Sequence, residues 1–588
     1  MKRSRICAGF ASSCARSAAP PRPPSAIRSA DSSTSSSSRA KTAPSTPAHL
    51  ASRSPPATAA HPAHAILLSL LAALTPVVAA CTPAVPTRRD VVLGIAGEPR
   101  AILSDEPSAQ ILQAAVTESL VRRDPDGGFV ARLATEVPTI ANGGARIVTD
   151  AATPGGRLVA TFELRSDARW QDGEPITADD VRFAFDDDRT APLTTARRWM
   201  SERVERVERI NDRTVRFTYR AGERWDLYPL VARVLPAHVL AGVSADKRMQ
   251  YLREPMHAGP FAVAAWIPGF GMTLSAFPSY VGGAPSLGRI EVRFYSDRGA
   301  VVDALRRGEV DVAGAPAVEA DLTRTLDRFA DGPRLQALYK AANAIEMLRF
   351  GTKNTVFTDL RVRQAVELAL DRRALVETIF AGRARVPRSY LVAPLWAATE
   401  PLDAPHLDRE SARGLLAAAG FRTGRLGILE RGAERMTVTL QVATGSQARI
   451  DAGRRLSGDL ASVGIAATVL ERSLADVLDT VSRGDFDLAL VPERTDDPQL
   501  ASDRYRGLAG PWFDVLLEAA VAAPEQAEKR SLYAEMQRVW AESLPGLPLY
   551  QELLVDVAPR NLEGIQPSPN GDPLTWNARD WRFTPGSN

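Results

Sequence analysis

LRSDARWQDGEPITADDVRFAFD, residues 164–186, joins the end of a strand, a tight turn and the capped start of a helix. The Asp-Gly pair at 172–173 predicts the turn, because glycine reaches the positive φ that many turns require. Thr177 and Asp180 have the spacing of a capping box, in which the Thr177 hydroxyl accepts from the Asp180 amide and the Asp180 carboxylate reaches back. Asp179 also lies where the helix dipole favours negative charge. We therefore predict that this acidic cluster is structural and not catalytic.

Strand and helix patterns alternate outward from this stretch, beginning near residue 90. Apolar or alternating runs predict strands at 91–95, 158–164, 214–219, 290–295, 437–442 and 465–470. Helical periodicity predicts helices at about 110–120, 178–187, 299–307, 359–380, 408–419, 447–463, 473–482 and 525–543. The predicted fold class is therefore α/β, with several sheets.

One short pattern occurs twice. RGEVDVA at 307–313 and RGDFDLA at 483–489 each follow a predicted helix. Glycine ends a helix readily because it adopts the left-handed conformation, and the alternating residues that follow predict a strand. The repetition indicates two similarly built lobes. A coincidence within a common helix–glycine–strand pattern is the alternative.

The chain has 588 residues, too many for one hydrophobic core, so two or more domains are expected.

The charge distribution argues against a nucleic-acid-binding protein. Nine of the 72 basic residues, but only one of the 69 acidic residues, lie in residues 1–80. The rest is mildly acidic, with a net charge of −5, whereas nucleic-acid binding needs a basic face.

The sequence carries little catalytic chemistry. No cysteine follows Cys81, which excludes disulfides, thiolate metal sites and catalytic thiols from residues 82–588. The three histidines in that range, His238, His257 and His406, are far apart in sequence. G-x-S-x-G, H-E-x-x-H and P-loop sequences are missing. We expect no enzyme activity, no cofactor and no metal; a two-domain hydrolase is the weaker alternative.

The N-terminal region predicts a disordered extension followed by a secretion signal. Residues 1–64 are rich in Ser, Ala, Pro and Thr and bury too little to fold; a translation start assigned too far upstream would look the same. Residues 65–81, AILLSLLAALTPVVAAC, form an apolar run too short for a membrane span and typical of a secretion signal.

The end of that signal resembles the lipobox of bacterial lipoproteins. Val78-Ala79-Ala80-Cys81 places small residues before a cysteine. The resemblance implies cleavage before Cys81 and lipid attachment to it, whereas an uncleaved anchor with Cys81 as a bystander is the alternative. Residues 82–87, TPAVPT, would then be a tether.

Six regions, in order along 90–555, carry a second resemblance. They are LVRRDPDGGFVARLATEVP at 120–138, the stretch 164–186, HAGPFAVAAWIPG at 257–269 with the segments up to ALRRGEVDVA, FGTKNTVFTDLRVRQAVELALDRRALVETIF at 350–380, DRESARGLLAAAGF at 408–421 and YAEMQRVWAESLPGLPLYQ at 533–551. The chain resembles family 5 of the bacterial extracellular solute-binding proteins, the oligopeptide-, dipeptide- and nickel-binding lipoproteins of ABC importers.

The resemblance implies a bilobed, periplasmic-binding-protein-like α/β fold of type II with an extra inserted domain, three domains in all. Domain I would comprise 88–130, 257–345 and 555–588. Domain II would be the insertion 131–256, and domain III would span 346–554. Ligand would bind between domains I and III, which close by a hinge.

The implied function is capture of a peptide or similar small solute. The protein would be an exported monomer, lipid-anchored at the outer face of the cytoplasmic membrane or in the periplasm. It would deliver its ligand to ABC permease subunits that are driven by cytoplasmic ATPases. A lipoprotein of the same fold that serves as a sensor or chaperone without import is the alternative.

The segment VPERTDDP, 491–498, corresponds to the family pattern W-x-A-D-Y-x-D-P, whose first aspartate holds the amino group of a peptide. An ungapped match puts Arg494 at that aspartate, and Asp496 fits only after a shift of two residues. Asp497 matches the end of the pattern. A buried Arg494 would favour an anion over an ammonium group; an exposed loop residue is the other interpretation.

Three further ligand contacts follow from weaker matching. Glu118 lies in a segment that resembles the family's E-G-L, and Trp199 follows the 164–186 stretch where relatives place an aromatic contact. Trp512 follows the Asp-Pro loop. A core or surface position is the alternative for each of them.

Overall fold

The computed structural model describes the chain from residue 90 to residue 584. Gaps in that description fall at 126–127, 152, 191–201, 221–233, 331, 352, 354–355, 400–405, 496 and 524. All described residues belong to one compact unit, Thr82–Asn588. The predicted extension, signal segment, lipobox with Cys81 and tether lie outside the described residues. In the described part, every helix is too short or too polar to cross a membrane.

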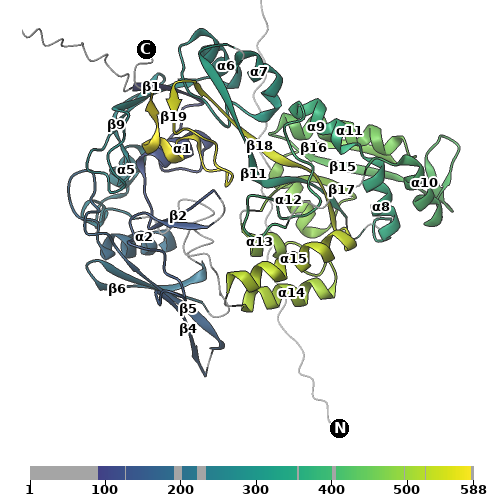
Figure 1. Cartoon of the computed structure of the whole chain (residues 1–588), viewed down its shortest axis with the longest axis horizontal. Coiled ribbons are helices and arrows are strands. Elements are labelled where there is room, and N and C mark those ends of the chain that lie inside the picture. Colours follow the sequence, from purple (N-terminus) through teal and green to yellow (C-terminus); the bar gives the residue numbers. More distant parts are fainter. Residues whose placement is uncertain are drawn as a thin grey trace, which may run out of the picture. The chain divides into compact units, whose positions relative to one another are not determined.

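Four strands from distant parts of the sequence form the first sheet, in the order β1 (Asp90–Ala96), β10 (Arg289–Tyr295), β9 (Gly271–Ala276) and β8 (Phe261–Ile267) (Figure 1). β1 pairs with β10 in parallel, although some 200 residues separate them. Elements from the beginning and the end of the described chain pack on this sheet. They are α1 (Pro107–Val116), η2 (Leu574–Asp580) and the paired strands β19 (Leu562–Glu563) and β20 (Arg582–Phe583).

The stretch 164–186 directly follows a strand of the second sheet. The order of this sheet is β4 (Ala145–Asp150), β5 (Thr153–Glu163), β7 (Thr214–Tyr219) and β6 (Val204–Asn211), all antiparallel. The helices and the short hairpin nearby are α2 (Ala178–Thr190), α4 (Ala237–Leu240), α5 (Ala245–Arg253), β2 (Val121–Arg123) and β3 (Phe129–Ala131).

The capping prediction for α2 is confirmed in one half and wrong in the other. The Asp180 carboxylate reaches back and accepts from the Thr177 amide at 2.8 Å. The Thr177 hydroxyl donates to that carboxylate at 3.2 Å instead of accepting from an amide. Asp180 also accepts from the indole of buried Trp170 and from the Ala237 amide. Because the carboxylate is already saturated by hydrogen bonds, its role is structural, as predicted.

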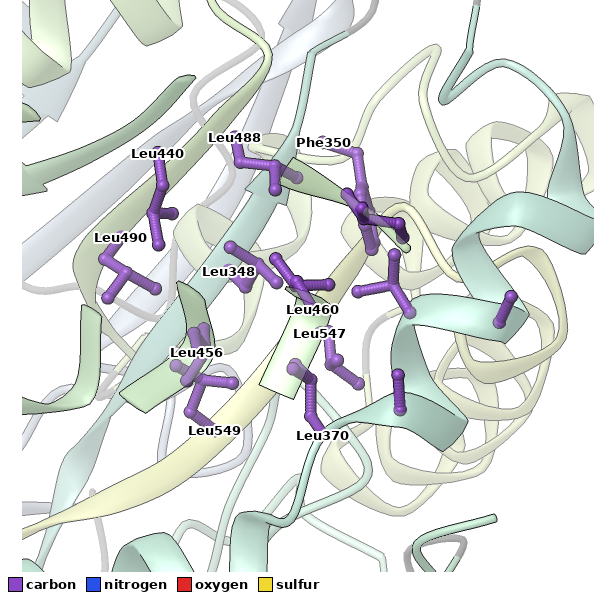
Figure 2. Packing of buried hydrophobic residues seen from close by; sticks show 14 of the residues in the cluster. Leu348, Phe350, Leu370, Leu440, Leu456, Leu460, Leu488, Leu490, Leu547 and Leu549 are labelled. Atoms are coloured by element: carbon purple, nitrogen blue, oxygen red, sulfur yellow. The ribbon is translucent and has the colours of Figure 1, made fainter. Parts of the chain in front are cut away.

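The third sheet has five strands, in the order β16 (Ala466–Arg472), β15 (Thr437–Ala443), β17 (Leu488–Arg494), β11 (Leu335–Phe350) and β18 (Gly546–Pro559). Strand alternation sends Leu348 and Leu488 to one face, and Met347 and Ala489 to the other. Both faces are covered by helices, so the strands are apolar on both sides. Figure 2 shows leucines of four of these strands meeting on the first face.

Two groups of helices cover this sheet. The first face packs against α8 (Leu360–Ala369), α9 (Arg372–Phe380), α10 (Arg409–Ala418) and α11 (Gln447–Ala461). The opposite face packs against α12 (Leu474–Arg483), α13 (Pro498–Asp503), α14 (Pro511–Ala522) and α15 (Gln526–Ser543). A small sheet of β12 (Arg422–Thr423), β13 (Leu429–Arg431) and β14 (Glu434–Arg435) follows α10.

The long antiparallel strands β11 and β18 extend beyond the third sheet. Their far ends, 335–341 and 553–559, pair with each other and join a separate core with α6 (Arg298–Arg307). The elements η1 (Ala320–Leu322) and α7 (Thr323–Ala330) lead into β11. The ladder is irregular between Ala341 and Ile345. These two strands therefore connect the third sheet with the core that contains α6.

Every predicted strand overlaps an observed one, but two predicted helices need correction. The helix predicted at 359–380 is two helices, because Leu370 is extended and the Asp371 carboxylate caps a new helix at the Ala374 amide. The helix predicted at 110–120 ends at Val116, where the Thr117 hydroxyl donates to a carbonyl of the last turn.

The repeated glycine pattern is confirmed at both helix ends and weakened after the first. Gly308 and Gly484 both adopt the left-handed conformation, with φ of 78° and 69°. Strand β17 follows Gly484, whereas only the single bridges of Val312 and Ala313 follow Gly308. The residues after Gly308 bridge singly to β1 and to β18, and these two strands form their ladders with β10 and β11 instead.

Candidate solute-binding cleft

A cavity of about 350 Å³ lies beside the β11–β18 ladder. Its walls come from α1, the segment 315–321, β11, the start of α11, β18 and the segment 567–574. These segments are far apart in the sequence. The volume is at the lower end of the range that small-molecule sites usually have.

Strand alternation places the charges of β18 in this cavity. Val555 and Val557 pack into the core beneath α6. The residues between and before them, Glu552, Leu554 and Asp556, share the opposite face, because alternate side chains of a strand lie on the same side.

Acidic side chains dominate the cavity wall. The carboxylates among the lining residues are Glu319, Asp321, Glu346, Glu552, Asp556 and Asp572. Arg449 is the single Arg or Lys among the described residues of the wall. The negative charge of the wall therefore exceeds what its own cation can balance.

Arg449 forms a buried ion pair with one of these acids, Glu346. Ser446 caps α11 and so fixes the start of the helix that carries Arg449. The guanidinium donates to Glu346 at 2.8 Å, and both side chains are buried. Burial nevertheless raises the pKa of Glu346 to about 7, with a further rise from the charge of Glu552 and an opposing effect of Arg449.

Two acids share a cation from outside the wall. Arg298 at the start of α6 lies 3.4 Å from Glu319 and 2.9 Å from Asp321. Burial still raises the pKa of Glu319, and the negative charges of Asp321 and Glu552 add to the rise. These carboxylates therefore repel one another across the cavity.

Asp556 differs from the other carboxylates. It is 5% exposed, and no hydrogen-bond donor of the described residues reaches its Oδ2 atom. Burial raises its pKa to about 8. Gly314 is packed against it: a Cβ atom at position 314 would lie 2.3 Å from Asp556 Oδ1.

Glu552, four residues before Asp556 and on the same face of β18, is half-buried and has no ion pair with a described residue. Burial raises its pKa, whereas the charges of Arg449 and Arg494 lower it. Two acids on one strand face are thus left without a cation in direct contact.

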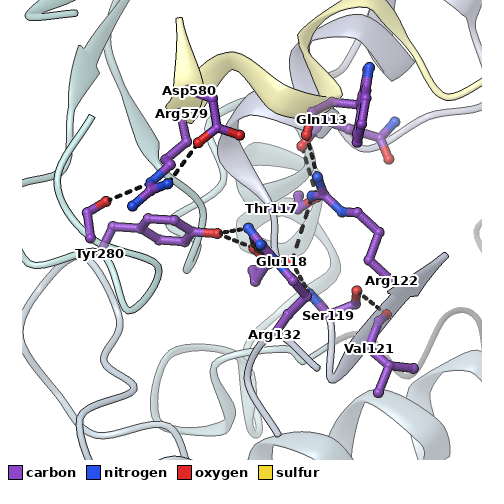
Figure 3. A network of polar contacts seen from close by, with 12 residues as sticks. Gln113, Thr117, Glu118, Ser119, Val121, Arg122, Arg132, Tyr280, Arg579 and Asp580 are labelled. Carbon is purple, nitrogen blue, oxygen red and sulfur yellow. Dashed lines mark hydrogen bonds and ion pairs between the residues drawn. The ribbon is translucent and has the colours of Figure 1, made fainter. Parts of the chain in front are cut away.

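Glu118, predicted as a ligand contact, lies outside the cavity wall in a saturated network (Figure 3). It accepts from Arg132 at 3.1 Å and from the Tyr280 hydroxyl, and Arg122 lies 3.6 Å away. Burial alone would raise the pKa of Glu118, but the two arginines and the Tyr280 hydroxyl lower it below its ordinary value. This geometry joins α1, β2 and the segment after β9.

Arg494 is exposed at the end of β17. Its guanidinium donates to the carbonyl of Asn570, and a Cβ at Gly571 would crowd it. Asn570 also binds Asn343 of β11 at 2.8 Å. Arg494 therefore ties β17 to the segment 567–574 at the rim of the cavity, which fits the interpretation of an exposed residue.

Asp497 and Trp512 also lie outside the cavity wall. Asp497 caps α13 by accepting from the Leu500 amide, and it lies 3.8 Å from Arg123 of β2. Trp512 is 54% exposed near the start of α14. Trp199 and Asp496 are outside the described residues. Ligand contact by these predicted residues stays a prediction.

None of the acids of the cavity wall is among the site residues predicted from the sequence. The signal was present in QELLVDV, 551–557, where two acids four residues apart interrupt an apolar strand on the same face. No spacing rule, however, brings β18 next to 315–321 and the start of α11. Among the described residues, no group of three or more His, Cys, Asp or Glu side chains is placed to hold a metal ion.

Comparisons with known proteins agree on one family. The family model described as "Bacterial extracellular solute-binding proteins, family 5 Middle" matches residues 145–510. The oligopeptide-binding protein AppA of Bacillus subtilis is 26% identical over 451 residues, 72% of this chain and 81% of that protein. Di/tripeptide-binding protein 2 of Pseudomonas aeruginosa is 24% identical over 453 residues, 70% of this chain and 82% of that protein.

Solved structures show the same fold. AppA of B. subtilis in complex with a nonapeptide matches with a TM-score of 0.62 and 22% identity, over 85% of this chain and all of that one. NikA of Brucella suis in complex with Fe(III)-EDTA matches with a TM-score of 0.69 and 19% identity, over 84% of this chain and all of that one. The fold is thus the bilobed periplasmic-binding-protein fold that the sequence predicted, and the chain belongs to family 5 of the bacterial extracellular solute-binding proteins.

Proposed function

We propose that this protein captures a short peptide or similar small solute in the cavity beside β11 and β18 and delivers it to the permease of an ABC importer. The observation that carries the proposal is the cavity itself, which is built by segments far apart in sequence around two connecting strands. The family is one of exported, non-enzymatic binding proteins of the bacterial cell envelope. The chain is accordingly a binding protein and not a hydrolase.

We assign the cavity to the boundary between two lobes. Lobe 1 is 88–130, 257–345 and 555–588, lobe 2 is 346–554, and 131–256 is an insertion. Lobe 1 would then supply α1 and the segment 567–574 to the cavity wall, and lobe 2 would supply Phe380 and the start of α11. A ligand in contact with both lobes favours the closed state by its differential affinity for that state.

Contacts at the rim support a closure motion. The Arg324 guanidinium donates to the carbonyl of Glu377 at 2.8 Å. Arg383 lies 3.0 Å from Asp327 and stacks over Tyr339 at 4.6 Å. These surface contacts join the two assigned lobes and are individually weak, so they can open and close with little cost.

The names of the relatives favour a peptide as ligand. One is named for oligopeptides and another for di- and tripeptides. The cavity volume of about 350 Å³ suits the shorter of these. NikZ of Campylobacter jejuni, a structure that holds Ni(L-His), matches with a TM-score of 0.64, so the fold also accepts other cargo.

The envelope anchor is part of the proposal. Lipid on Cys81 would hold the protein at the membrane, and 82–87 would act as its tether. Intact mass and N-terminal sequencing of protein from its own host test this. A chain that begins at an acylated Cys81 supports the anchor, and an unmodified Cys81 within a longer chain contradicts it.

The function is tested by native mass spectrometry of protein purified gently from its own host. We expect a bound species of low mass that is lost on collisional activation. Thermal shift against peptide, sugar and metal libraries provides the second readout. An empty protein without a melting shift in any library would contradict solute capture and favour the sensor or chaperone alternative.

A further inference from the structure

The unpartnered carboxylate of Asp556 is the feature of the cleft that its own residues do not explain. Its side chain is 95% buried, it lines the cavity, and its Oδ2 atom receives no hydrogen bond from a described residue. A buried charge without a partner is costly, so native proteins neutralise it or pair it. Asp556 must therefore carry a proton or face a cation that the described residues do not supply.

The surrounding charges do not supply that cation. Arg449 is held by Glu346 at 2.8 Å. Arg298 is shared by Glu319 and Asp321. Asp572 of the facing segment accepts from Ser568 at 2.6 Å and adds negative charge.

The elements packed against Asp556 are equally unable to neutralise it. Leu338 is its partner on β11, and Gly314 and Leu574 are close neighbours. None of the three has an ionisable side chain. Its own strand contributes Glu552, another acid without an ion pair to a described residue.

We propose that the cleft is specific for a positively charged solute and that Asp556 pairs with an ammonium group of that solute. The inference rests on the proposed function and narrows its ligand to a chemical class. The ammonium group is either the α-amino group of a peptide or a basic side chain.

Cation binding in this geometry displaces a proton. Because burial raises the pKa of Asp556 to about 8, the empty cleft holds this carboxyl protonated at neutral pH. An ammonium group stabilises the carboxylate, so binding releases the proton. Affinity therefore rises as the pH increases from 6 to 8, whereas a neutral ligand would show no such coupling through Asp556.

Isothermal titration calorimetry of the full-length protein tests this with four tripeptide probes. Trialanine carries an α-ammonium group, N-acetyl-trialanine carries none, N-acetyl-Ala-Lys-Ala carries a side-chain ammonium group, and N-acetyl-Ala-Glu-Ala carries an extra acid. We expect at least one ammonium probe to bind about tenfold or more tightly than N-acetyl-trialanine, because a charge-assisted hydrogen bond is lost without the ammonium. The stronger of trialanine and the lysine probe identifies the source of the ammonium group.

Proton release is the second readout. The same titrations in two buffers of different ionisation enthalpy should show release of up to one proton at pH 7. Equal or tighter binding of N-acetyl-trialanine or of the glutamate probe would overturn the cation specificity but leave solute capture intact. Absence of binding by all four probes, together with an empty protein from the host, would overturn both.

Two variants distinguish the loss of the Asp556 charge from the loss of an acidic charge elsewhere on the protein. D556N keeps the size of the side chain and removes the charge; we expect at least tenfold weaker binding of the ammonium probe and no proton release. D303N is the matched control, because Asp303 is exposed on α6 and pairs with Arg306 at the surface. Unchanged binding and proton release in D556N would overturn the inference.

Discussion

Two buried carboxylates of this protein have opposite surroundings. Glu118 is 4% exposed and is met by Arg122, Arg132, the Tyr280 hydroxyl and the Ser119 amide. Asp556 is 5% exposed, and its Oδ2 receives no hydrogen bond from a described residue. Similar burial therefore accompanies a lowered pKa in the first and a raised pKa in the second. The comparison separates a carboxylate that stabilises the fold from one that is kept available for a ligand.

Removing the charge of Glu118 should have the largest effect on stability. E118Q would leave the Arg132 and Arg122 guanidinium groups without their acid. We expect a loss of about 3–5 kcal/mol in the free energy of unfolding, as for one partner of a buried ion pair. Denaturant unfolding measures this, with E309Q on the exposed Arg307–Glu309 pair as the control. A change within about 1 kcal/mol of the control would show that the network is not structural.

Removing the charge of Asp556 should have the opposite effect and stabilise the ligand-free protein. Its folded pKa is raised, so the folded state binds more protons than the unfolded state between about pH 4 and pH 8, and stability is lost as the pH rises through that window. D556N removes this loss. We expect the ligand-free variant to be more stable than wild type by several kcal/mol at pH 8, since the folded pKa lies about four units above its ordinary value and each unit corresponds to about 1.4 kcal/mol.

Thermal and denaturant unfolding at pH 5 and pH 8 check that expectation. The advantage of D556N should shrink toward pH 5. Glu118 provides the internal contrast, because its lowered folded pKa contributes stability at neutral pH that is lost as the pH falls. A D556N variant less stable than wild type at pH 8 would mean that Asp556 has a protein partner.

Gly314 allows the position of Asp556 to be changed without removing its charge. A Cβ atom in G314A would lie 2.3 Å from Asp556 Oδ1, so the carboxylate must move. We expect weaker binding of the ammonium probe, together with a loss of about 1–3 kcal/mol in the free energy of unfolding, the usual cost of overpacking. G414A on α10 is the control, because a Cβ there meets open space. Equal binding by G314A and wild type would show that the exact position of the carboxylate is unimportant.

The rim contacts should matter least. Arg383 and Asp327 are partly exposed and lie 3.0 Å apart, so a double-mutant cycle with R383Q and D327N should give a coupling energy of about 0.2–1 kcal/mol. A coupling above about 2 kcal/mol would indicate that the pair locks the two lobes together in the absence of ligand.

The sequence predicts local structure well where a residue and its partner are close along the chain. Asp180 reaches back to Thr177, and Gly308 and Gly484 end their helices, because each feature depends on neighbours a few residues away. The fold followed from the resemblance, which covered most of the chain.

The residues that line the cleft could not be predicted in this way, because they come from distant parts of the chain. Asp556 and Glu346 come from strands whose register is set by pairing over some 200 residues, and Arg449 comes from a helix on another part of the sheet. The break between α8 and α9 at Leu370 and the end of α1 at Val116 were missed because a capping side chain overrides helical periodicity. The motif in 491–498 predicted a ligand contact at Arg494, but this residue ends β17 and lies at the rim of the cavity.

Native mass spectrometry of wild type, D556N and D303N, each purified from the protein's own host, shows whether Asp556 holds a cationic solute in the cleft. We predict that wild type and D303N carry a small amine-bearing solute and that D556N is empty. A neutral or acidic solute retained equally by all three proteins, or an empty wild type, would contradict cation binding by Asp556.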